Sequence, residues 1–348
     1  MRLQVSSALR VPAAGNLNRW RASMIRAGSL GHVRAALVLA VLMLSLNSPL
    51  ARGADIAATQ PGVALELYFV DAHSQVDEDV SDLGLIIRRM DAAGVYRTVL
   101  AARSGRKPGE VADLAAQHPQ RIVPSVRTKS GAFDKNPAKW RKFVQAQVNS
   151  GRFRAMAEML LYHARKGDKA PEVRVYPDDD RVTFALAAAA ERGWPFVVHI
   201  EFASLSPPER DRFMGGFEAL LREHPTLPFL LNHMGQLQPP EAARLIKAHA
   251  NFHLLTAHTT SVITRESREP WTRMFEGDHL SPAWKELILT HPDRFVFALD
   301  NVWYQHWDAF YLKQVKQWRH ALAEVPPSVA HAVAHGNAER LYRLEPRQ

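Results

Sequence analysis

The sequence predicts an α/β protein, a single-domain (β/α)8 TIM barrel preceded by an N-terminal signal peptide. After Ala54, short apolar runs typical of strands alternate with helical patterns about every 30 residues, and eight such runs occur before the C-terminus. The first run leads into His73-Ser74-Gln75. An open doubly wound sheet usually has a glycine-rich phosphate-binding turn at that point, so we favour a closed barrel over an open sheet.

We assign residues 1–53 to a leader and residues 54–348 to the barrel. The leader has seven arginines, no lysine and no acidic residue, and its apolar core, Ala35–Leu46, is followed by small residues at Ala51 and Gly53. This order is typical of an export signal, and Met24 is a candidate true start. We expect cleavage near Ala54 and a periplasmic or secreted protein with no membrane attachment, with a retained N-terminal anchor as the alternative.

The charge and the cysteine content exclude several classes of function. The formal net charge of +9 comes largely from the leader. Outside the leader, the chain has 37 of its 44 Lys and Arg residues and 35 Asp and Glu residues, so the two signs nearly cancel. This near balance argues against nucleic acid as a partner. The chain has no cysteine, which excludes disulfides, thiolate nucleophiles and cysteine metal ligands.

The elements can be placed along the chain from their patterns. A helix over Val80–Ala93 is expected to stop at Gly94, and another is expected to begin after Asn136-Pro137, because proline suits a first helical turn. The segment Thr259–Leu280 is expected to be an insertion beside the substrate. The eight strands are predicted at Leu65–Asp71, Arg97–Ala102, Ile122–Arg127, Ala155–Leu161, Phe196–Glu201, Phe229–His233, Phe252–Ala257 and Phe295–Asp300.

Four of these strands end in side chains that can bind metals. They are His73 after the first strand, His199 after the fifth, His233 after the sixth and Asp300 after the eighth. A barrel brings the carboxyl ends of its strands to one face, where active sites lie. A lone histidine after an apolar strand is more often structural, but four such groups favour a shared site.

Several motifs resemble the amidohydrolase-related (amidohydrolase 2) family of the metal-dependent amidohydrolase superfamily, over residues 65 to 344. They are Asp71-x-His73, His199, Asn232-His233-Met234-Gly235, the run from His291-Pro292-Asp293-Arg294-Phe295 to Asp300, and Gly336-Asn337-Ala338-Glu339-Arg340-Leu341-Tyr342.

The resemblance implies a distorted (β/α)8 barrel, usually with one divalent metal ion. Family members commonly hydrolyse C–N or C–O bonds or decarboxylate aromatic and related acids. By the same resemblance, His73 and His199 would bind the metal. Asp300 would bind it and accept the proton of its water, and His233 would polarise the substrate carbonyl or hydrogen-bond the nucleophile.

Gln75 is the departure from the expected pattern, because a second histidine would be the familiar residue there. An amide oxygen is a weaker zinc donor than imidazole, which moves the balance from zinc towards manganese, magnesium or no metal. Gln75 therefore either binds the metal or only faces the pocket. Glu158, in the fourth strand, either supplies a replacement metal ligand or forms an interior ion pair.

Four further residues are candidates for contact with substrate. Arg127 could bind a substrate carboxylate, with a structural role as the alternative. His163 and His258 follow strands and could line the mouth, although loop histidines are often incidental. Trp303 belongs to an aromatic segment that either forms an apolar wall or packs against the last helix. Glu201 could orient His199.

These observations lead to a functional hypothesis: an exported hydrolase in which a metal-activated water attacks a small amide, ester or lactone. Asp300 would be the general base and His233 the carbonyl-polarising group. The cofactor would be one divalent ion, zinc or manganese, whose presence Gln75 leaves open, and the partner a small molecule such as a carboxylate or aromatic acid derivative. The alternatives are a metal-dependent decarboxylase and a metal-free binding or sensory barrel. The oligomeric state stays open.

Overall fold

The structure, a computed structural model, describes residues 67–166 and 171–347. The predictions for the signal peptide, the Met24 start and the cleavage site lie outside the described residues. The described residues belong to one unit that spans Val63–Gln348. Among them there is no helix with the length and hydropathy needed to cross a membrane.

The strands form two main sheets in which neighbours are parallel, with β6 as the antiparallel exception. The first sheet has the order β1 (Phe69–Val76), β2 (Val95–Ala102), β3 (Ile122–Val126) and β4 (Ala155–Met156). The second has the order β12 (Phe295–Val296), β9 (Phe252–Leu255), β8 (Phe229–Leu231), β7 (Phe196–Ile200), β5 (Met159–His163) and β6 (Val173–Arg174).

Backbone hydrogen bonds continue from one sheet to the other on both sides. The strands β4 and β5 are two pieces of one predicted strand, so residues 155–163 connect β3 to β7. On the other side, the amides of Ala72 and Gln75 donate to Phe297 (2.9 Å) and Asn301 (2.7 Å), and the amide of Asp300 donates to His73 (2.8 Å). The prediction of an α/β fold is confirmed, and the parallel sheets are consistent with a TIM barrel.

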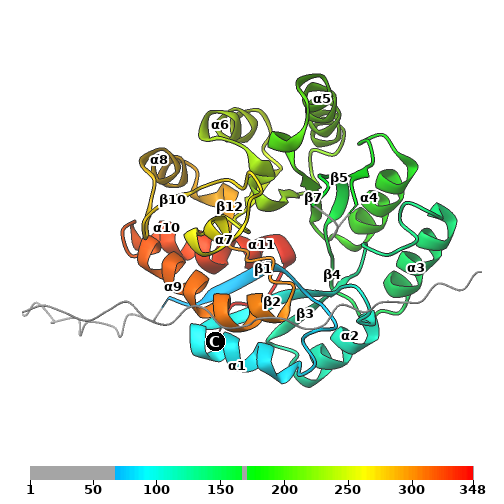
Figure 1. Cartoon of the computed structure of the whole chain (residues 1–348), viewed down its shortest axis with the longest axis horizontal. Helices are drawn as coiled ribbons and strands as arrows, with labels where there is room; N and C mark the ends of the chain where they lie inside the picture. The colour runs from blue at the N-terminus through cyan, green and yellow to red at the C-terminus, as the bar shows by residue number, and fades with distance from the viewer. Residues whose placement is uncertain (1–66, 167–170, 348) are drawn as a thin grey trace, which may run out of the picture. The chain divides into compact units, whose positions relative to one another are not determined.

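Helices surround these strands in Figure 1. Their first turns commonly contain proline, and α1 and α4 end at Gly94 and Gly193 with left-handed backbone. The helices that follow strands are α1 (Gly84–Ala93), α2 (Pro108–Gln117), α3 (Pro137–Asn149), α4 (Asp180–Arg192), α5 (Pro207–Glu223), α6 (Pro239–Ala248) and α8 (Pro282–Thr290). The two helices predicted above, α1 and α3, are confirmed to within a few residues.

The rest of the chain adds short elements and a helical C-terminus. The predicted insertion holds α7 (Ser261–Glu266) and the hairpin of β10 (Phe275–Glu276) and β11 (His279–Leu280). The C-terminal part holds a π-helix, η4 (His306–Phe310), then α9 (Tyr311–Leu322), α10 (Pro327–His331), the π-helix η5 (Ala332–Gly336) and α11 (Asn337–Tyr342). Single 3₁₀ turns are η1 (Phe202–Ser204), η2 (Asn232–Gln236) and η3 (Pro292–Arg294).

The C-terminal helix α11 packs against the inner apolar layer of the strands. Small and β-branched side chains such as Val70, Ala72 and Val99 form this layer together with Leu341 and Tyr342 of α11. The Tyr342 hydroxyl donates to the Ala72 carbonyl at 3.0 Å. A separate and larger apolar cluster lies between strands and helices. The apolar interior therefore leaves polar side chains for the opposite, carboxyl ends of the strands.

Three strands differ most from their predicted bounds, each close to a site residue. The first runs to Val76, so His73 and Gln75 lie within β1 rather than after it, and a register shift between Asp71 and Ser74 interrupts its pairing with β2. The fourth breaks around Glu158. The eighth ends at Val296, and the chain then reaches Asp300, which has a positive φ of 46°.

Candidate active site

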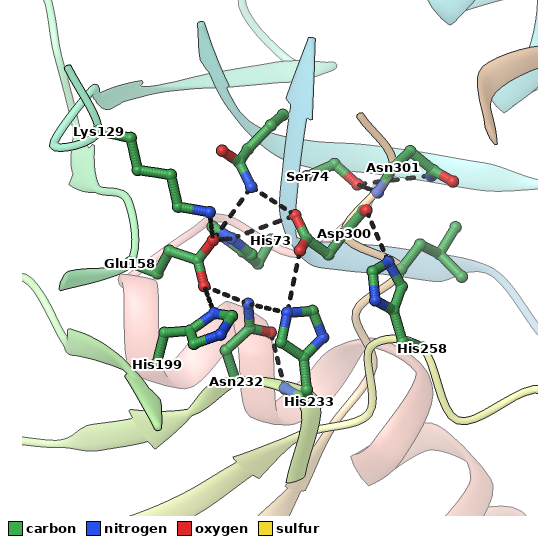
Figure 2. Close-up of polar contacts among 12 residues, drawn as sticks. His73, Ser74, Lys129, Glu158, His199, Asn232, His233, His258, Asp300 and Asn301 are labelled. Atoms are coloured by element: carbon green, nitrogen blue, oxygen red, sulfur yellow. Dashed lines mark hydrogen bonds and ion pairs between the residues drawn. The ribbon is translucent and has the colours of Figure 1, made fainter. Parts of the chain in front are cut away.

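The structure brings together the predicted site residues at the carboxyl ends of the strands (Figure 2). His73 and Gln75 come from β1, and His199 comes from β7. Glu158 lies between β4 and β5, and His233 and Asp300 lie two and four residues beyond the ends of β8 and β12, where the backbone is outside the strand pairing and can direct a side chain inward. All six side chains are buried, with at most 3% of each residue exposed.

Asp300 lies between two histidines and an amide. Its Oδ1 accepts a hydrogen bond from the Gln75 side-chain nitrogen at 2.7 Å and lies 3.5 Å from His73 Nε2. Its Oδ2 lies 3.2 Å from His233 Nε2. His258 Nε2 is 3.2 Å from the backbone oxygen of Asp300, so four strand ends converge on one carboxylate residue (Figure 2).

Glu158 is the second buried carboxylate, and both of its oxygens have nitrogen partners. Oε1 accepts from Gln75 at 3.1 Å and contacts the Lys129 ammonium. Oε2 lies 2.6 Å from His199 Nδ1 and accepts from Asn232 Nδ2 at 2.6 Å. The ion-pair alternative for Glu158 is therefore present, together with a position beside the predicted metal ligands.

His199 has a partner on each ring nitrogen. Besides Glu158 on Nδ1, its Nε2 lies 3.1 Å from Glu201 Oε1. Glu201 is fixed in turn by Lys166 Nζ at 2.6 Å and by the Ala164 amide at 2.9 Å. Glu201 thus has the orienting position predicted from the sequence, whereas the predicted role of His199 as a metal ligand stays a prediction.

His233 is presented by an unusual turn. His233, Met234, Gly235 and Gln236 have φ values of 53°, 54°, 61° and 58°, a run of left-handed backbone directly after β8. Such backbone is costly for residues other than glycine and often marks a functional site. The Asn232 side chain supports the turn because its oxygen accepts from the His233 amide at 2.9 Å.

The site keeps its two carboxylates ionised. Burial acts to raise the pKa of Glu158, but Lys129 and His199 hold it well below the ordinary value. Burial and the Glu158 charge act to raise the pKa of Asp300, but the contacts with His233 and His73 hold it well below its usual range. Burial lowers the pKa of His233 and that of His258, so both imidazoles are neutral near pH 7.

A cavity of about 850 Å³ opens above these groups, and Asp300, His199 and His233 are among its lining residues. The predicted contacts His163, His258 and Trp303 also line it, and the predicted insertion contributes a wall. The insertion's lining residues are Ile263, Glu266, Ser267, Arg268, Glu269 and Trp271. A second cavity of about 740 Å³, near Tyr96 and Arg343, contains no predicted site residue.

Arg127 does not line the cavity. Its guanidinium donates to the backbone carbonyls of Lys129 and Arg106, which is the structural role considered for it. Arg103, which directly follows β2, lines the cavity instead and lies 5.3 Å from the Trp303 ring centroid. Arg103, rather than Arg127, is therefore placed to bind an anionic group of a substrate in the cavity.

Five groups of donor atoms in the described residues could hold a divalent cation, and four of them lie in this site. His73 Nε2 and oxygens of Glu158 and Asp300 lie within 4.8 Å of one another. His73 Nε2 is buried and has no hydrogen-bond partner, which is the state expected of an atom that binds an ion. Gln75 directs its amide nitrogen, which cannot bind a metal, to both carboxylates, so its predicted ligand role stays a prediction.

Sequence reasoning missed four polar residues near the site. Lys129, Lys166 and Arg103 lie in loops just beyond strands, where periodicity carries no information on side-chain direction. Asn232 was part of a recognised motif, but its contact with Glu158 depends on the turn that follows β8.

Comparison with known proteins identifies the family to which the chain belongs. The chain matches the amidohydrolase family over residues 70–344 and therefore belongs to that family, whose superfamily is metal-dependent and whose members include hydrolases and decarboxylases. No curated relative matches the sequence.

Solved structures with this fold have low sequence identity to the chain. A 2,6-dihydroxybenzoate decarboxylase from Rhizobium has a TM-score of 0.53 at 14% identity, over 80% of this chain and 99% of that one. A candidate 2-pyrone-4,6-dicarboxylic acid hydrolase from Pseudomonas putida has a TM-score of 0.50 at 15% identity, over 81% and 100%. An uncharacterized TIM-barrel protein from Bordetella bronchiseptica has a TM-score of 0.50 at 18% identity, over 76% and 83%. These likenesses show the fold alone.

Proposed function

We propose that the protein hydrolyses an ester, lactone or amide bond in a small substrate that carries a carboxylate. The observation that supports this most is Asp300, an ionised carboxylate at a cavity floor between His73 and His233. A carboxylate held ionised is suited to accept a proton from an attacking water. Membership in the amidohydrolase family is compatible with this reaction class and equally with the decarboxylase alternative.

The remaining roles follow from the positions of the side chains. His233 lines the cavity beside Asp300, and we assign its ring the contact with the substrate carbonyl or leaving group. His73, Glu158 and Asp300 would hold a divalent cation. When bound, the cation would lower the pKa of water and polarise the scissile carbonyl.

The substrate class is inferred from the cavity wall. Arg103 stacks near Trp303 on one side, and the ring of Trp271 lies 4.7 Å from the His233 ring. A guanidinium beside aromatic rings suits a planar molecule with a carboxylate. The structural neighbour from Rhizobium acts, by its description, on a dihydroxybenzoate, which is such a molecule.

A substrate panel tests the proposal. Lactones, aryl esters and amides with and without a carboxylate are offered to the wild-type protein and to Asp300→Asn, with hydroxybenzoates as the decarboxylation arm and release of CO₂ as its readout. We expect hydrolysis of at least one carboxylate-bearing substrate and a loss of kcat of about 100-fold or more in Asp300→Asn. Turnover in the decarboxylation arm alone would replace hydrolysis by the decarboxylase alternative. Specific binding without turnover in either arm would favour the binding or sensory barrel.

A further inference from the structure

Glu158 has no free acceptor position. It is 0% exposed, and its two oxygens face four nitrogen partners: Gln75 and Lys129 on Oε1, and His199 and Asn232 on Oε2. A carboxylate has about four lone-pair sites, so these partners occupy all of them. A metal ion that binds Glu158 must therefore displace one of the four.

The four partners of Glu158 differ in how easily a metal ion can displace them. Gln75 can rotate its amide and present the oxygen, which is a metal donor. Asn232 and His199 occupy the other oxygen. Lys129 contacts the oxygen that also lies 3.8 Å from His73 Nε2, and an ammonium group has no lone pair to offer a metal.

Lys129 is held in this position by the loop on which it lies. The neighbouring Thr128 hydroxyl donates to the Glu158 backbone oxygen at 2.5 Å, and Trp140 Nε1 donates to the Thr128 carbonyl at 2.7 Å. These contacts tie the loop after β3 to the chain at Glu158. The Lys129 side chain is 17% exposed and lines the cavity, which gives its ammonium a way out from the carboxylate.

We propose that Lys129 is a built-in cation that competes with a divalent ion for Glu158. In its inward position it balances the buried carboxylates without a metal. Metal binding requires the ammonium to move into the cavity, because two cations beside one oxygen repel each other. The inference rests on the proposed cation position between His73, Glu158 and Asp300, but it does not depend on which bond the protein breaks.

Metal titration tests this directly. Protein freed of metal with a chelator, which is then removed, is titrated with Mn²⁺ or Zn²⁺ by equilibrium dialysis, and the bound metal is measured by elemental analysis. We expect Lys129→Met to bind one ion at least about tenfold more tightly than the wild type, because a like charge next to the ion is removed. Lys129→Arg keeps the charge and is expected to bind within about twofold of the wild type.

Lys166→Met is the matched control. Lys166 lines the same cavity, but its ammonium pairs with Glu201 at 2.6 Å rather than with Glu158. We expect its metal affinity to stay within about twofold of the wild type. An equal gain of metal affinity in Lys166→Met and Lys129→Met would overturn the proposal, because the loss of any positive charge from the cavity would then explain both results.

Thermal unfolding provides a readout that a merely structural lysine would not give. Lys129→Met is expected to have a lower Tm than the wild type without metal and to recover it when Mn²⁺ is added, because the ion then replaces the missing charge. Lys129→Gln is a second neutral variant should Lys129→Met fail to fold. No gain of affinity and no rescue in a folded neutral variant would refute the inference, whatever the substrate panel shows.

Discussion

At the scale of single residues, the site depends on a few side chains whose charge is set by their neighbours. Asp300 and Glu158 are buried yet ionised, because histidines and Lys129 surround them. His233 is neutral because it is buried. A base, a neutral polarising group and a place for a cation therefore coexist within one small volume.

Arg103→Met tests how the substrate is recognised. If the guanidinium beside Trp303 binds a carboxylate, KM for carboxylate-bearing substrates should rise about tenfold or more, with kcat nearly unchanged. Neutral esters should be converted as before. The control is Arg268→Met, an exposed arginine at the same cavity. A fall in kcat for all substrates would contradict a role confined to binding.

His253→Gln tests a pH effect on stability away from the site. Burial, with Arg294 and Arg340 nearby, lowers the pKa of His253 from 6.5 to about 4. The unfolded chain then binds the proton first, so this stabilisation is complete above pH 6.5 and is lost as the pH falls towards 4. This loss amounts to about 3 kcal/mol in the free energy of unfolding. Urea unfolding at a series of pH values should therefore show that the free energy of unfolding falls by about 3 kcal/mol less in His253→Gln than in the wild type. Equal pH slopes in both proteins would contradict this assignment.

The site residues could be predicted only where the position of a residue along a strand determines the direction of its side chain. His73, His199, His233 and Asp300 were found because the carboxyl ends of parallel strands meet at one face. The inward turn of Lys129 could not be found, because it depends on Thr128 and Trp140 fixing the loop. Arg127 was considered both for a substrate carboxylate and for a structural role, and its guanidinium turns to backbone carbonyls, which is the structural role.

At the scale of elements, irregular backbone is concentrated where the site is built. His233, His258 and Asp300 have positive φ values of 53°, 59° and 46°. Such conformations cost free energy that the surrounding contacts must offset. The left-handed turn after β8 is the longest of these irregular segments, and it determines where His233 lies.

Gly235→Ala tests whether this turn needs its glycine. Gly235 has φ +61°, and an added Cβ would lie 2.5 Å from Leu231 Cδ2. We expect a loss of about 1 to 3 kcal/mol in the free energy of unfolding and lower activity, because His233 would shift. The control is Gly277→Ala, with φ +63° but no atom within 4 Å of the added Cβ, which should cost about 1 kcal/mol. If chemical denaturation gave the same loss of unfolding free energy for Gly235→Ala and Gly277→Ala, the close packing of Gly235 against Leu231 would be unimportant.

Predictability also differed among elements for physical reasons. The start of α3 at Pro137 was predicted because proline suits a first helical turn. The break in the fourth strand was not, because AMAEMLL alternates without a glycine or proline, and only the pairing of its two halves with different strands reveals it.

At the scale of the whole molecule, the two sheets, the helices around them and α11 at one end leave one set of strand ends for chemistry. The alternation of strands and helices is enough to predict this arrangement. The substrate cannot be predicted in the same way, because one fold serves many reactions and loops decide the specificity. In this protein the insertion after β9 is such a loop, because it forms part of the cavity wall.

Export stays a prediction that concerns the whole chain. We propose that the protein is periplasmic or secreted, on the basis of the arginines and the apolar core within residues 1–53. When the full chain is expressed in a bacterium, N-terminal sequencing should find a mature form that begins near Ala54. An intact leader on cytoplasmic protein would contradict export, and an intact leader in the membrane fraction would support the retained anchor.

The central claim is that this site adds water across a bond of its substrate. Turnover of an accepted substrate in oxygen-18 water measures this directly, because a base-assisted attack by water leaves one solvent oxygen in the new carboxylate. We predict one labelled oxygen per product molecule for the wild type, and in Asp300→Asn a matching fall in the rate of product formation and in the rate at which label is incorporated. Product that contains no solvent oxygen and has lost CO₂ would contradict the account.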